Sequence, residues 1–215
     1  MSACEVTVID YGIGNLLSVQ RGLEHCGAKV FLTKAPEKIL SAKRVVLPGV
    51  GAFANAMKVL EKLDLVSVIQ EVAQRKTPLL GICLGMQLLL NESDEFGTTA
   101  GLGIIPGRVV PLPKNTLFGA MQKIPHIGWN QLLVANSLSH WQDSILTDIS
   151  PGDAAYFVHS FMAVPTNSEH RIADCLYGGH KIPAAIGYDQ IIGCQFHPEK
   201  SGEVGLKILR RFCAA

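Results

Sequence analysis

The first half of the chain alternates short β-branched runs with longer segments of helical periodicity, and no other feature constrains the fold as much. Strand-like runs cover residues 6–10, 29–32, 44–47 and 78–82. Between them, apolar residues recur at spacings of three and four, which is typical of helices that bury one face. Because strands separated by helices usually pair in parallel, we expect a parallel sheet with helices on both faces.

The second half has a different pattern, in which strands follow one another closely. A final amphipathic helix is predicted over residues 203–212, and two pairs of turn residues, at 178–179 and 189–190, suit hairpins. We therefore expect residues 1–215 to form a single α/β domain, with a central, mostly parallel sheet flanked by helices and an antiparallel-rich second half. The strand-like runs of this half are residues 107–112, 129–134, 156–160, 171–176, 184–188 and 191–196.

Composition excludes several classes of protein. Lys and Arg number 19 and Asp and Glu 18, so the net charge of +1 argues against nucleic-acid or membrane-surface binding through bulk charge. The longest apolar stretch, residues 78–90, is too short to span a bilayer, and the start lacks the basic region of a secretory leader. The six cysteines form no CxxC pair, so we expect a cytoplasmic protein with reduced thiols. Five of the six are expected to be small buried hydrophobes.

The strongest chemical signal is the run Gly81-Ile82-Cys83-Leu84-Gly85, which has a nucleophile between two glycines. An apolar strand is predicted before it and a helix after it. Such a turn places the sulfur at a helix N-terminus, where the helix dipole favours the thiolate. The alternative is a buried cysteine in a tight turn.

A base for this thiol is available near the C-terminus, in the run Gln195-Phe196-His197-Pro198-Glu199. In extended backbone, side chains two residues apart point the same way, and Pro198 disfavours helix at His197. Glu199 is therefore predicted to orient the imidazole and leave its other nitrogen for Cys83. Alone, the segment would more often be a loop histidine beside a solvated carboxylate.

Two further backbone groups are predicted to hold an oxyanion. Val50 lies between Gly49 and Gly51, where the backbone can approach a ligand, and the Leu84 N–H directly follows the nucleophile. The alternative is a glycine-rich turn without a ligand. No HExxH, GxGxxG or P-loop pattern is present, so we expect neither a metal nor a cofactor. The histidines at 126, 140 and 170 are expected to be surface or packing residues.

These residues resemble class I glutamine amidotransferases, through GICLGMQ and QFHPE. Within that family, the chain is similar to the glutaminase subunits of imidazole glycerol phosphate synthase. One departure is Phe161, where that group usually has Tyr, and residues 134–155 match none of its motifs. The supporting stretches run in order along the chain, at residues 10–15, 48–53, 83–87, 125–130, 156–160 and 195–201.

The resemblance implies a role for each of these segments. Cys83 attacks the side-chain amide of L-glutamine, protonated His197 donates to the leaving ammonia and then activates water, and Glu199 orients His197. Ammonia passes to a (β/α)₈ cyclase that makes imidazole glycerol phosphate and a carboxamide ribotide in histidine biosynthesis. The amino-acid end of glutamine would be held by Gly51, Gln87 and the backbone of Ser160 and Phe161. The residues that would face the partner are Asn15, Trp129, Tyr156 and Lys200.

Other readings stay open from the sequence. The chain could be the glutaminase subunit of another amidotransferase, a stand-alone γ-glutamyl or cysteine hydrolase, or a thiol sensor without enzymatic activity. If it is a partner-dependent glutaminase, we expect the isolated chain to be nearly inactive. The peptide around Val50 can turn away from the oxyanion position until a partner biases it.

Overall fold

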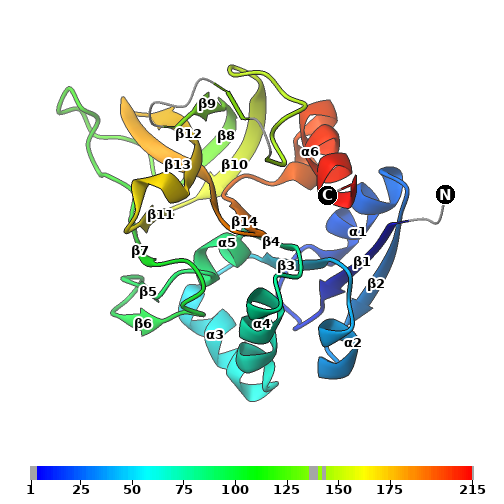
Figure 1. Ribbon diagram of the computed structural model, residues 1–215. Helices are drawn as coiled ribbons and strands as arrows, with labels where there is room; N and C mark the ends of the chain where they lie inside the picture. Colours follow the sequence, from blue (N-terminus) through cyan, green and yellow to red (C-terminus); the bar gives the residue numbers. More distant parts are fainter. Residues whose placement is uncertain (1–3, 136–139, 142–143, 215) are drawn as a thin grey trace.

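A computed structural model describes residues 4–135, 140–141 and 144–214. An eight-stranded sheet forms the centre of the described structure (Figure 1). Its strand order is β2-β1-β3-β4-β14-β13-β12-β9. The first five of these strands pair in parallel, and the last three continue the sheet antiparallel. The strands are β1 Cys4–Ile9, β2 Ala28–Thr33, β3 Val45–Gly49, β4 Leu79–Cys83, β9 Leu133–Val134, β12 Arg171–Tyr177, β13 His180–Tyr188 and β14 Ile191–Cys194.

Helices cover both faces of the parallel half of this sheet. Helices α1 (Leu16–His25) and α6 (Gly202–Ala214) pack together on one face, while α2 (Pro36–Leu40), α3 (Phe53–Lys62) and α4 (Leu65–Gln74) pack on the other. Successive strand residues supply the two cores in turn, because side chains alternate across a sheet. In β3, for example, Val46 belongs to the first core and its neighbours Val45 and Leu47 to the second.

Two smaller sheets complete the second half of the chain. One pairs β8 with β10, antiparallel, and the other has the order β11-β7-β5-β6. The short helix α5 follows β4 directly, and a 3₁₀ helix, η2, leads into α6. The bounds of these elements are α5 Leu84–Leu88, β5 Glu92–Ser93, β6 Thr99–Ala100, β7 Gly107–Pro111, β8 His126–Gln131, β10 Ala154–His159, β11 Phe161–Pro165, η1 Ser168–His170 and η2 Pro198–Lys200.

The predicted architecture is confirmed, since the central sheet is mostly parallel, helices flank it, and the antiparallel strands come from the second half. The prediction that the third strand stops before Pro48 is wrong. Pro48 and Gly49 continue β3, in register with Ile82 and Cys83 of β4. Strand β11 and helix α2 were not predicted. Among the described residues, no helix is long and apolar enough to cross a membrane.

The cysteine prediction is only partly confirmed. Cys175, Cys194 and Cys213 are buried, as expected, and burial raises the pKa of the Cys175 thiol to about 12. Cys4 and Cys26 are instead half-buried at the edge of the core between the sheet, α1 and α6. All six cysteines lie in the described residues and all are free thiols.

Candidate functional site

The elbow around Cys83 has the strained geometry that its sequence predicts. Cys83 ends β4 and directly precedes α5, with φ of 54° and ψ of −109°. A positive φ is rare for a residue with a side chain and costs on the order of 1–3 kcal/mol. Both flanking glycines are needed, because a Cβ on Gly81 would lie 2.7 Å from the Gly85 carbonyl oxygen and one on Gly85 would collide with the Leu47 carbonyl.

Strand β14 brings the second catalytic candidate to the same end of the sheet. It pairs in parallel with β4, with Cys194 opposite Ile82, so the residues that follow β14 emerge beside Cys83. His197 is then fixed by its backbone, since its N–H donates to the Tyr156 carbonyl at 2.9 Å. The Ser201 hydroxyl donates to the His197 carbonyl at 2.6 Å and accepts from the Tyr156 N–H at 2.9 Å.

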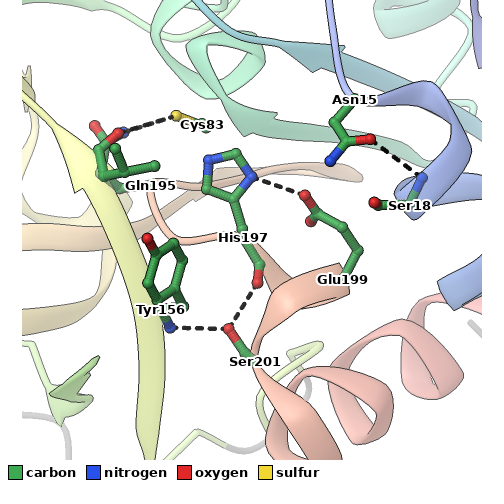
Figure 2. A network of polar contacts seen from close by, with 9 residues as sticks. Asn15, Ser18, Cys83, Tyr156, Gln195, His197, Glu199 and Ser201 are labelled. Atoms are coloured by element: carbon green, nitrogen blue, oxygen red, sulfur yellow. Dashed lines mark hydrogen bonds and ion pairs between the residues drawn. The ribbon is translucent and has the colours of Figure 1, made fainter. Parts of the chain in front are cut away.

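Glu199 holds the ring of His197, as the spacing of the two residues predicts. His197 Nδ1 lies 2.8 Å from Glu199 Oε1, and both side chains are almost completely buried. Figure 2 shows the other ring nitrogen, Nε2, on the side that faces Cys83. This nitrogen is buried and has no hydrogen-bond partner among the described residues. It is therefore the free nitrogen of the ring, which a catalytic base requires.

Electrostatics favour the protonated form of His197. Burial lowers its pKa, but the neighbouring Cys83 and the Glu199 carboxylate outweigh this and raise the pKa to about 9. An imidazolium beside Cys83 is therefore populated at neutral pH. Such a cation stabilises a thiolate and can later give its proton to a leaving group.

A pocket of about 380 Å³ opens above Cys83. It brings together the predicted nucleophile, base and oxyanion groups with the residues expected to hold a substrate. Glu199 lies behind His197 rather than in the pocket wall. The lining residues are Val50, Gly51, Cys83, Leu84, Gln87, Glu95, Pro125, Val158, His159, Ser160, Phe161 and His197.

Gln87 and Phe161 present complementary polar groups. The Gln87 amide nitrogen donates to the Phe161 carbonyl at 3.2 Å and to Gln195 Oε1 at 3.0 Å. Both amide hydrogens are thus used, and Gln87 can offer a ligand only the acceptor Oε1. Phe161 is opposite Pro111 in a non-hydrogen-bonded pair, since the Leu112 N–H donates to the Ser160 carbonyl. The Phe161 N–H therefore points away from β7 and is available as a donor.

Glu95 is a pocket residue that the sequence analysis missed. Its Oε2 accepts from the backbone N–H of Phe53, at the first residue of α3, at 2.5 Å, and the side chain lines the pocket. The sequence carried one signal, the acidic residues at 92, 94 and 95 just after the elbow helix. Such a run ordinarily indicates a solvated loop, and only the turn after α5 brings one member back over Cys83. The pocket residues Pro125 and His159 were also not predicted.

The residues expected to face a partner lie close to η2. The Trp129 side chain is 59% exposed and contacts Tyr156 edge to face, with ring centroids 6.2 Å apart. A Cβ on Gly202 would lie 3.9 Å from the Trp129 ring, and Lys200 on η2 is exposed. Asn15 caps α1 by accepting from the Ser18 N–H at 3.4 Å, and Figure 2 shows it above Glu199. These residues therefore lie on one side of the site, close to η2.

Comparisons with known proteins agree with this geometry. The family described as "Glutamine amidotransferase class-I" matches residues 7–215. The chain is 51% identical to imidazole glycerol phosphate synthase subunit HisH 1 of Legionella pneumophila (strain Lens) over 207 residues, covering 96% of this chain and 97% of that one. It is 44% identical to subunit HisH of Lactococcus lactis over 210 residues, covering 97% of each.

A solved structure adds support for the fold alone. PurLQS from Thermotoga maritima superposes with a TM-score of 0.74 at 18% identity, covering 98% of each chain. The elbow, the oriented histidine and the matched length thus lead to one conclusion. The chain belongs to the class I glutamine amidotransferase family.

Proposed function

We propose that this chain is the glutaminase subunit of an imidazole glycerol phosphate synthase, and that it hydrolyses L-glutamine to glutamate and ammonia. The observation that carries the proposal is the meeting of Cys83, His197 and the Glu199 carboxylate at a pocket of about 380 Å³. The names of the relatives at 44–51% identity support the choice of synthase. The proposed site of action is the cytoplasm, where the free thiols stay reduced.

The pocket wall suits the amino-acid end of glutamine. The Glu95 carboxylate and Gln87 Oε1 are acceptors for the α-ammonium group, and the Phe161 N–H is a donor for the α-carboxylate. Ser160 and Gly51 line the same wall. Since the contact from residue 161 is made by its backbone, a Phe in place of the usual Tyr does not remove it.

Acylation begins with the Cys83 thiolate attacking the side-chain carbonyl carbon of glutamine. The carbonyl oxygen becomes an oxyanion, for which the proposed donors are the Leu84 N–H and the peptide around Val50 and Gly51. The support for this role is that all three residues line the pocket. Losing one such donor typically costs about 3–4 kcal/mol of transition-state stabilisation. The His197 imidazolium then gives its Nε2 proton to the departing nitrogen, ammonia leaves, and a γ-glutamyl thioester remains on Cys83.

Deacylation reverses the direction of proton transfer. Neutral His197 takes a proton from water, and the resulting hydroxide attacks the thioester carbonyl. The carbon–sulfur bond breaks, which releases glutamate and restores the thiolate and the imidazolium. Glu199 keeps the ring in one orientation through both halves of the cycle, because its bond to Nδ1 leaves Nε2 free to give and take the proton.

Ammonia is then delivered to a (β/α)₈ cyclase bound as a heterodimer, which makes imidazole glycerol phosphate and the aminoimidazole carboxamide ribotide. The surface proposed for this contact contains Asn15, Trp129, Tyr156 and Lys200. Two more apolar side chains are exposed nearby in the sequence, Leu17 at 56% and Ile127 at 55%. Exposed apolar groups of this kind are typical of a surface that a partner covers.

The deciding experiment is a glutaminase assay of the purified chain, with and without the cyclase and its ribotide ligand. We expect glutamate release to be slow from the chain alone and strongly stimulated in the complex. Steady turnover without the partner would indicate a stand-alone hydrolase. No turnover under either condition, with Cys83 still reactive toward thiol reagents, would favour a thiol sensor.

A further inference from the structure

A continuous chain of polar groups runs from β8 to the wall of the pocket, and the two buried histidines in it have no part in the proposed reaction. It begins at Asn130, whose amide nitrogen lies 3.2 Å from His126 Nε2. His126 Nδ1 lies 3.0 Å from His159 Nε2. His159 Nδ1 in turn lies 2.8 Å from the carbonyl oxygen of Phe161. The chain thus connects β8 to the residue that borders the pocket.

Only one placement of the ring protons on His126 and His159 allows every hydrogen bond in this chain to form. Asn130 Oδ1 accepts from the Gln131 N–H at 2.8 Å, which fixes the orientation of the amide, and the amide nitrogen also donates to the Leu176 carbonyl. His126 Nε2 must therefore accept, and its proton lies on Nδ1 and is donated to His159 Nε2. His159 then carries its proton on Nδ1 and donates it to the Phe161 carbonyl. The Phe161 carbonyl at the other end of the chain can only accept a hydrogen bond. It therefore requires the same positions of the two ring protons as the Asn130 amide does.

The surroundings hold both rings rigidly and keep them neutral. His126 and His159 are 3% and 6% exposed. The His126 ring is stacked between Phe157, at a centroid distance of 5.0 Å, and Tyr177, at 4.0 Å. Burial lowers the pKa of each histidine to about 4. The two rings are therefore fixed in position and in tautomer at neutral pH.

We propose that His126 and His159 are positioning residues which, through this proton order, hold the Phe161 carbonyl and so fix the orientation of the Gln87 amide that donates to this carbonyl at the pocket. The proposal rests on the proposed glutaminase function, in which Gln87 Oε1 accepts from the α-ammonium group of glutamine. If His126 no longer donates, the proton of His159 can move to Nε2. A lone pair on Nδ1 would then face the Phe161 carbonyl oxygen, and this repulsion would turn the Phe161–Met162 peptide and weaken the hydrogen bond that its carbonyl accepts from the Gln87 amide.

The test compares three substitutions at one position. His126→Asn keeps an amide hydrogen close to the Nδ1 position. His126→Gln carries the same amide group at the Nε2 position and loses that donor, and His126→Phe keeps the stacking but no polar atom. In the complex with the cyclase, we expect Gln and Phe to raise KM for glutamine at least tenfold with kcat within threefold, and Asn to stay within threefold of the parent on both.

A second readout separates positioning from general damage. Inactivation by a chloroketone built on the glutamine skeleton depends on the amino-acid end, whereas alkylation of Cys83 by iodoacetamide does not. His126→Gln and His126→Phe should slow the first at least tenfold and leave the second within twofold. The control is His180→Phe, which removes a histidine that also contacts a backbone carbonyl, that of Asn115 at 2.8 Å, but does not line the pocket. It should change neither rate.

Three results would overturn the proposal. The first is an unchanged KM in both His126→Gln and His126→Phe. The second is an equal loss of both inactivation rates, which would indicate a merely structural role. The third is no difference between His126→Asn and His126→Gln, and this pair decides the question even if His126→Phe does not fold. A parent complex that releases no glutamate would instead refute the proposed function, and this inference with it.

Discussion

At the scale of single residues, the site depends on three side chains with different surroundings. Cys83 is held by a strained backbone, His197 by hydrogen bonds of its own main chain, and Glu199 by burial beside the ring. None of these constraints depends on the reactive atoms themselves. Substitutions of the reactive atoms should therefore change the chemistry without changing the fold.

Cys83→Ser is the most direct test of the nucleophile. Serine preserves size but is not ionised beside an imidazolium at neutral pH, so glutamine hydrolysis in the complex should fall by about 10³-fold or more. Ammonia release measures the loss, and circular dichroism with a thermal melt checks that the fold is intact. Hydrolysis at the parent rate would mean that the nucleophile is misassigned.

His197 should also leave a signature in the pH dependence of stability. Its pKa is raised from about 6.5 in the unfolded chain to about 9 in the fold. The resulting stabilisation is complete below about pH 6.5 and is lost as the pH rises through about 9. Urea unfolding at several pH values should show a fall on the order of 1–3 kcal/mol over this window in the parent protein.

His197→Gln provides the matched control for that experiment, because it removes the titrating group and leaves a polar side chain of similar reach. The difference between the two pH curves, rather than either curve alone, reports His197. Parallel curves for the parent and the variant would show that the raised pKa is not a property of the folded chain.

At the scale of elements, the site is made where β3, β4 and α5 approach each other closely. Gly85 on α5 is in contact with the main chain at Leu47 on β3, and no side chain fits between them. The apolar strand and the two glycines together predicted this turn from the sequence alone. This close crossing of α5 over β3 therefore determines where the Cys83 sulfur lies relative to the peptide around Val50.

Gly85→Ala should force this crossing apart. Overpacking of this kind costs about 1–3 kcal/mol or more, and the sulfur would move with α5. We expect a lower melting temperature and a loss of glutaminase activity. Gly119→Ala is a suitable control, since its φ is also positive, at 84°, but a Cβ there meets nothing within 4 Å. It should cost only the local strain, about 1–2 kcal/mol, and leave activity unchanged.

At the scale of the whole molecule, the exposed apolar side chains of Leu17, Ile127 and Trp129 support the proposal that the protein works with a partner. Trp129 is the largest of them and lies against Tyr156. Buried aromatic anchors dominate the energy of many interfaces. The proposed partner surface should therefore depend on Trp129 more than on any single charge.

Trp129→Ala should weaken binding of the cyclase by about 2 kcal/mol or more, roughly thirtyfold in Kd, and should lower stimulated glutaminase activity at limiting partner. Calorimetric titration measures the affinity. Phe31→Ala is the control, because Phe31 is also exposed, at 41%, but lies on β2, an edge strand of the eight-stranded sheet, whereas Trp129 lies on β8 of the separate β10-β8 sheet. Equal effects of the two substitutions would remove Trp129 from the interface.

A feature of the fold or the site could be predicted from the sequence when the residues that form it lie close together in the chain. The elbow and the His197–Glu199 spacing are short-range patterns, and periodicity identified most of the strands and helices. Glu95 and the chain from Asn130 to Phe161 were not predicted, because each joins segments that are distant in the sequence. No pattern within a single segment shows that His126 and His159 share a proton.

The position of β14 has a consequence for how the protein is made. This strand comes from the last part of the chain but lies between β4 and β13, so the ribosome releases the sulfur long before the imidazole that activates it. Until residues 191–194 emerge, the edge of β4 has no neighbour on that side and can pair with another nascent chain. A chain that ends before this strand lacks His197 and leaves that edge of β4 unpaired, so we expect it to be inactive and prone to aggregation.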